Sequence, residues 1–125
     1  MNKHALPLAR FGDATAQRLD ELLPAYARKE NPVDLAGQVG TDPHLFRHAC
    51  LAIAADGRTE AVVVQHANSG RRFLAQDGEF YKQVARALPV VVSFVADSLD
   101  PPTRKEYLDA GVLLSPDPAA TMQAL

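Results

Sequence analysis

The chain repeats one pattern three times, and this pattern restricts the folds open to it. Each repeat is a short β-branched run, a turn of polar residues or glycine, and then an amphipathic helix. The runs are residues 61–64, 89–92 and 111–114, and the helices are expected to begin near Asp77, Pro101 and Pro118. Strands that alternate with helices need crossover connections, which give a parallel sheet covered by helices. The sequence therefore predicts an α/β fold that binds ligands at the carboxyl ends of its strands.

Two further helices are expected before the repeats. Asp13 can cap the first, with Leu19, Leu22 and Leu23 on one stripe. Thr41 or Asp42 can cap the second, with Pro43 at its first position. The segment at 31–35 must be extended, because a residue before proline avoids the α region. Four strands are expected, near 32–35, 61–65, 90–95 and 112–114, in a single domain over residues 1–125.

Composition excludes several classes of protein. The net charge is -2 and the basic residues form only isolated pairs, so nucleic acid binding is not expected. No apolar run approaches the roughly 20 residues needed to span a membrane. The single Cys50 rules out an intramolecular disulfide and lies on the apolar face of its expected helix, where an inert core role is expected. We expect a soluble, cytoplasmic protein.

The loop after the 61–65 strand is the leading site candidate. Asn68, Ser69 and Gly70 could form a nest of backbone N–H groups, and Arg71 could add positive charge. Free N–H groups, together with the dipole of the helix that follows this loop, favour an anion there. The alternative interpretation is an ordinary polar surface loop.

Three other residues are candidates for the ligand edge of the sheet. His66 ends its strand, and Asp34 and Asp97 both follow apolar extended segments. Each has a structural alternative: His66 can be partly buried, Asp34 can bind the turn at 37–40, and Asp97 or Asp100 can cap the helix at Pro101.

A histidine pair has the spacing of metal ligands but little else to support a metal site. His44 and His48 lie four residues apart on one helix face. No third ligand is evident, so no metal is predicted.

Four segments together resemble one family. The most specific is residues 31–37, which are similar to the NPVDL-G segment of acyl-CoA synthetases that form a nucleoside diphosphate, relatives of succinyl-CoA synthetase. The helix and strand at 42–64, the strand at 89–94 and the ending at 110–120 also resemble that family, in the same order and spacing.

The resemblance implies a flavodoxin-like ligase domain of a multidomain enzyme. That family couples acyl-CoA, phosphate and a nucleotide through a phosphohistidine, and a helix N-terminus points at the phosphoryl group. Residues 68–71 would then bind phosphate. CoA and ATP or ADP with Mg²⁺ are implied for the complete enzyme, with no cofactor and no catalytic residue in this chain. The resemblance implies other domains or subunits as partners.

The Gly-rich strand–helix unit that opens this domain in the family has no counterpart here. The chain is then either a fragment, or its sheet is completed in another way, for example by a second copy. An unpaired strand edge favours association, so we expect a homo-oligomer. The alternative function is a non-catalytic interaction or dimerisation module with a vestigial anion site. A response-regulator-like receptor is disfavoured, because no acidic cluster follows the first strand.

Overall fold

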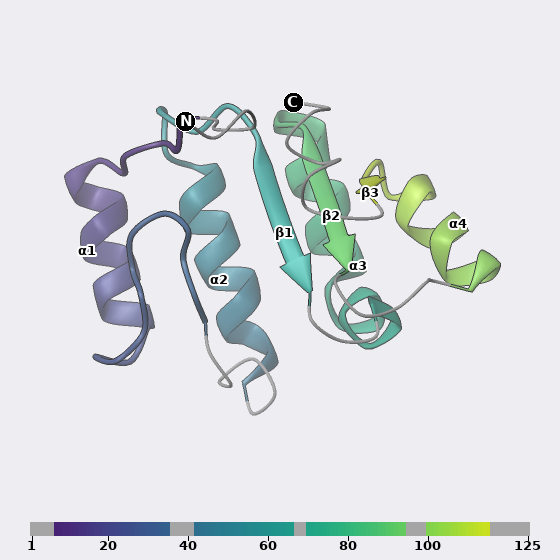
Figure 1. The fold of residues 1–125 in the computed structure, drawn as a ribbon, viewed down its shortest axis with the longest axis horizontal. Helices are drawn as coiled ribbons and strands as arrows, with labels where there is room; N and C mark the ends of the chain where they lie inside the picture. Colours follow the sequence, from purple (N-terminus) through teal and green to yellow (C-terminus); the bar gives the residue numbers. More distant parts are fainter. Residues whose placement is uncertain (1–6, 36–41, 67–69, 95–99, 116–125) are drawn as a thin grey trace, which may run out of the picture. The chain divides into compact units, whose positions relative to one another are not determined.

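The computed structural model describes residues 7–35, 42–66, 70–94 and 100–115 (Figure 1). The described residues form two compact units, one of Pro7–Glu60 and one that starts at Ala61. The single domain over 1–125 stays a prediction. Within the described ranges, no helix has the length and apolar character needed to cross a membrane.

The carboxy-terminal unit contains a parallel sheet, as the repeated pattern predicts. Its strands are β1 (Val62–His66), β2 (Val90–Phe94) and β3 (Leu113–Ser115), and they pair in the order β1-β2-β3. Helix α3 (Gly70–Ala87) contacts β2, and α4 (Pro101–Asp109) contacts both β3 and α3. Each strand lies within one residue of its predicted position. The flavodoxin-like α/β class is confirmed.

The two faces of this sheet differ in burial. Paired residues of parallel strands share a face, and the pairs Val62–Val90 and Val64–Val92 are all buried. The opposite face is more open at its flanks, where Val63 is 46% exposed and Leu113 is 57% exposed. Two aromatic residues add to the core of the unit. Tyr81 of α3 meets Tyr107 of α4 edge to face, with ring centroids 5.6 Å apart, and both are fully buried.

Helix α4 has defined signals at both ends. Asp100 caps its start, as predicted: the carboxylate accepts hydrogen bonds from the Thr103 backbone N–H (3.2 Å) and hydroxyl (2.7 Å). At its end, the N–H of Gly111 donates to the Leu108 carbonyl and that of Val112 to the Tyr107 carbonyl. This pair of bonds is a Schellman motif, in which glycine supplies the left-handed residue.

The described part of the amino-terminal unit contains a pair of helices. Helix α1 (Asp13–Leu22) and α2 (Pro43–Ala54) contact each other. Their shared core follows the predicted stripes and consists of Leu19, Leu23, Leu45 and Ala49. The Asp42 side chain accepts a hydrogen bond from His44 N–H at 3.0 Å, which confirms the predicted cap of α2.

The cap predicted for α1 is wrong. The N-cap position is Gly12, and Asp13 is the first helical residue. Among the described residues, no side chain caps the first turn of α1. Asp56, 44 positions away, instead fixes the residue before the helix, because its Oδ2 accepts the Gly12 N–H at 2.8 Å. Hydrogen bonds from the Arg58 N–H, the Thr15 side chain and Gly12 lower the pKa of Asp56.

The predicted strand near 32–35 is also not a strand of the sheet. Asp34 makes an isolated antiparallel bridge with Arg28, and its N–H donates to the Arg28 carbonyl at 3.0 Å. The Asn31 amide donates to the Ala9 carbonyl at 2.9 Å. These bonds pair polar groups of this segment outside the sheet. Val33 and Leu35 of the same segment pack against the core between α1 and α2.

Candidate functional site

The carboxyl ends of the strands define the candidate site. Because the strands are parallel, β1 and β2 end at the same edge, where His66 pairs with Phe94. Residues 67–69 lead from β1 to Gly70, the first residue of α3, and Figure 1 shows α3 starting beside the strand tips. This edge is where parallel α/β sheets bind ligands.

The structure gives the position in the fold of four of the predicted site residues. Gly70 and Arg71 are the first two residues of α3, and His66 is the last residue of β1. Asp34 lies in the amino-terminal unit, at the bridge with Arg28. The remaining predicted residues, Asn68, Ser69 and Asp97, lie outside the described residues, as does the helix predicted near Pro118. The binding roles of the whole set stay predictions.

Helix α3 begins at Gly70, seven residues before the predicted start near Asp77. The apolar residues Phe80, Tyr81 and Val84 in the second half of the helix are buried. The first half includes Gly70, Asp77 and Gly78, whose low helix propensity does not favour a helix start at Gly70. The correction moves a helix N-terminus next to the end of β1.

The electrostatics of this helix start suit an anion. The first N–H groups of a helix lack intrahelical partners, and the dipole places partial positive charge there. No acidic residue lies in the first turn of α3, and Arg71 adds a formal positive charge to the sequence there. Binding of an oxyanion at this helix start stays a prediction.

A row of polar residues crosses the sheet close to this edge, and sequence reasoning missed it. Register pairs Gln65 with Ser93, and Ser93 with Ser115. Ser93 is 1% exposed, and within the described ranges its hydroxyl has no hydrogen-bond partner. In the sequence, Ser93 only continues the run after Val92. The row is visible once the register of all three strands is known.

The other side chains considered for chemistry have structural positions. His44 and His48 are both exposed, with ring centroids 6.3 Å apart. The described part of the chain contains no group of three or more residues able to hold a metal ion. Cys50 is buried, which confirms its predicted place in the core.

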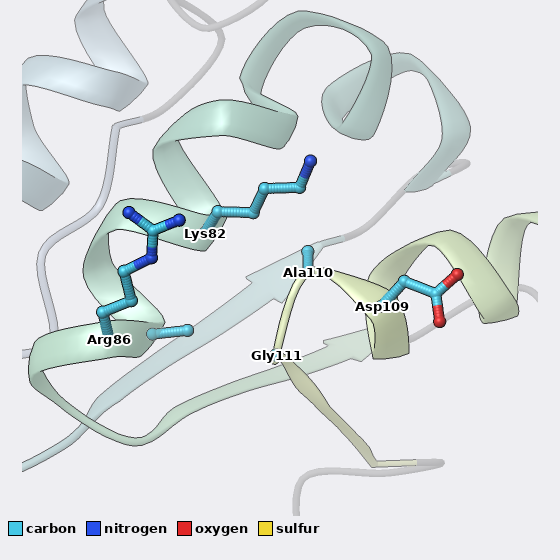
Figure 2. Close-up of a pocket in the computed structure, with 6 residues that line it drawn as sticks. Lys82, Arg86, Asp109, Ala110 and Gly111 are labelled. Carbon is cyan, nitrogen blue, oxygen red and sulfur yellow. The ribbon is translucent and has the colours of Figure 1, made fainter.

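Two cavities lie away from this edge. One of about 390 Å³ lies between the ends of α3 and α4 (Figure 2). Two of its charged residues already have partners, since Lys82 pairs with Glu79 at 3.2 Å and Asp109 with Lys105 at 2.7 Å. Both helices end where the next strand begins, so the cavity lies at the amino edge of the sheet. The second, of about 520 Å³, lies in the amino-terminal unit between residues 8–11 and 29–31.

The chain matches solved structures in fold, while no protein-family model and no curated protein matches it. The crystal structure of PH0766 from Pyrococcus horikoshii OT3 has a TM-score of 0.79 at 18% identity, over 98% of this chain and 29% of that one. The dinucleotide forming acetyl-coenzyme A synthetase 1 of Ca. Korarchaeum cryptofilum matches in its apo form, with a TM-score of 0.74 and 16% identity over 97% of this chain and 27% of that one. The same synthetase in complex with phosphate and ADP gives a TM-score of 0.75 at 16% identity, over 97% and 26% of the two chains.

These matches concern the fold, because the identities are 16–18%. The chain spans 26–29% of the length of the matched structures. The resemblance seen first in residues 31–37 is confirmed at this level by an independent comparison of backbones. The fold of this chain resembles a part of PH0766 and a part of the dinucleotide forming acetyl-coenzyme A synthetase 1.

Proposed function

We propose that this chain is the phosphoryl-handling domain of an acyl-CoA synthetase that forms a nucleoside diphosphate. The observation that carries the proposal is the start of α3 at Gly70, directly after β1 at the carboxyl edge of a parallel sheet. The fold supports it, since a matched synthetase was solved with phosphate and ADP bound. In this proposal the chain holds an oxyanion and contributes contact surface to neighbouring domains.

The chemistry assigned to the chain is binding and orientation. The backbone N–H groups of Ser69, Gly70 and Arg71 would donate to phosphoryl oxygens, with Asn68 completing the nest. The Arg71 guanidinium would neutralise part of the negative charge of the bound phosphoryl group. CoA, ATP or ADP and Mg²⁺ would be held by other domains of the complete enzyme, so acyl transfer by this chain alone is not expected.

A titration of the purified chain with inorganic phosphate tests the proposal. In 15N–1H correlation spectra, the amides of residues 68–71 should shift and saturate, while sodium chloride at equal ionic strength should not move them. Arg71→Gln should weaken binding roughly tenfold or more, the usual effect of losing a charged hydrogen bond. Arg72→Gln is the matched control, because it removes the same charge one residue further along the helix.

The alternative is an interaction module with a vestigial anion site. Phosphate would then leave the four amides unmoved in an otherwise well-dispersed spectrum. Equal phosphate affinities for the Arg71→Gln and Arg72→Gln variants would indicate nonspecific attraction and would also count against the proposed site.

A further inference from the structure

The polar row on the sheet begins where its aliphatic rows stop. The preceding row in register is Val64, Val92 and Leu114. The next residue of each strand is polar, which gives Gln65, Ser93 and Ser115 on one face of the sheet. Neighbouring strands lie about 4.8 Å apart, so a single small molecule can reach more than one member of the row.

Ser93 is the unusual member of this row. It is 1% exposed on the central strand, yet its hydroxyl has no hydrogen-bond partner among the residues described. An unpaired buried hydroxyl destabilises a folded protein, and native structures contain few of them. Its partner on β1, Gln65, is exposed. The row therefore extends from an accessible amide on β1 to a buried hydroxyl on β2.

The position of the row connects it to the proposed anion site. Gln65 is the penultimate residue of β1, and α3 begins at Gly70 a few residues later. Ser93 is the penultimate residue of β2, at the same edge. A ligand whose anionic group lies at the start of α3 would therefore have the rest of its body close to the row. The row carries hydroxyl and amide groups without formal charge, which complement hydroxyl or amide groups on a ligand.

We propose that the row is a second subsite, in which Ser93 binds the organic part of a phosphorylated ligand that carries hydroxyl or amide groups. This inference rests on the proposed function and adds the class of ligand: a polar phosphoester, which should bind more tightly than inorganic phosphate. In this proposal the Ser93 hydroxyl has no partner among the described residues because its partner is the ligand.

Three probes separate the two subsites in 15N–1H titrations: inorganic phosphate, propyl phosphate and glycerol 3-phosphate. Propyl phosphate has the three-carbon body without hydroxyls, so it serves as the matched ligand. Glycerol 3-phosphate should bind roughly two- to tenfold more tightly than propyl phosphate, as one or two neutral hydrogen bonds would give. It should also shift the amides of Gln65, Ser93 and Ser115, which phosphate alone should leave in place.

Ser93→Ala should abolish the advantage of glycerol 3-phosphate and leave phosphate affinity unchanged. Its stability in urea should equal or exceed that of the wild type, since the variant removes an unpaired hydroxyl. Thr59→Val is the matched variant, because the Thr59 hydroxyl is also buried without a described partner, but in the amino-terminal unit. It should change neither affinity.

The outcomes distinguish the two proposals. If phosphate binds at residues 68–71 but glycerol 3-phosphate has no advantage, or keeps it in Ser93→Ala, the second subsite is overturned and the proposed function stands. If no probe shifts residues 68–71, the proposed function fails. A loss of stability in Ser93→Ala with unchanged binding would make Ser93 a structural residue and would overturn the inference.

Discussion

Replacement of Gly111 by alanine tests how the chain turns from α4 into β3. Gly111 has a φ of +86°, in the left-handed region where an added Cβ costs roughly 1–2 kcal/mol. That Cβ would also lie 3.3 Å from the Cβ of Ala85 on α3, closer than an ordinary contact. Such overpacking adds about 1 kcal/mol. We expect Gly111→Ala to lower the free energy of unfolding of the carboxy-terminal unit by about 2–3 kcal/mol.

Urea unfolding, followed by the amide resonances of β2 and α4, measures this loss in the unit concerned. With a urea dependence of about 2 kcal/mol per molar, the midpoint should fall by roughly 1–1.5 M. Gly57→Ala is the matched control, because a Cβ at Gly57 meets no atom within 4 Å. Its effect should stay within about 0.5 kcal/mol.

A second substitution at Gly111 separates the two causes of the lost unfolding free energy, which are backbone strain and the close contact with Ala85. Asparagine tolerates the left-handed region better than alanine, but it carries the same Cβ toward Ala85. Gly111→Asn should therefore recover the backbone share of the loss and keep the steric share. Equal midpoints for the wild type and Gly111→Ala would refute the reasoning as a whole, and equal midpoints for the two variants would refute the backbone share.

Three further predictions concern a carboxylate, a helix cap and the state of association. The lowered pKa of Asp56 means that its hydrogen bonds stabilise the fold above the ordinary value of 3.8, and that this stability is lost as pH falls through the lower folded value. The difference in urea stability between the wild type and Asp56→Asn should thus be largest above pH 4 and shrink below it; a constant difference would contradict the assignment. Asp100→Ala should cost about 1 kcal/mol through loss of the α4 cap, whereas Asp109→Ala, which breaks an exposed ion pair, should stay within about 0.5 kcal/mol. Light scattering should report a dimer or larger species, and a mass of 13.5 kDa would contradict that expectation.

The sequence predicted β1 and β2 well because each begins with a run of three valines between turn signals. Val90, Val91 and Val92 leave little choice of structure, and burial of all three follows from a central strand. The cap of α4 at Asp100 was equally readable, since this signal is local. Local chemistry and hydrophobic pattern agree at these positions.

Other features of the structure were not predicted from the sequence. Asp56 accepts the Gly12 N–H from 44 positions away, and nothing near Gly12 in the sequence indicates this contact. Asp34 pairs with Arg28, six residues earlier, in place of a sheet partner, and the extended pattern of the sequence does not distinguish these two partners. At the candidate site, the helix start at Gly70 was missed because Gly70, Asp77 and Gly78 have low helix propensity. Ser93 was missed because burial and register are properties of the folded sheet.

The pairing order of the sheet has a consequence for how the chain folds during synthesis. Each described strand pairs with the one next to it in the chain, so β1, α3 and β2 can form a paired unit before β3 has been made. The later strand then adds to a finished template, with α4 closing behind it. Sheets that pair strands distant in sequence fold slowly, and their unpaired strands are exposed to aggregation during synthesis. Pairing of sequential strands reduces both effects.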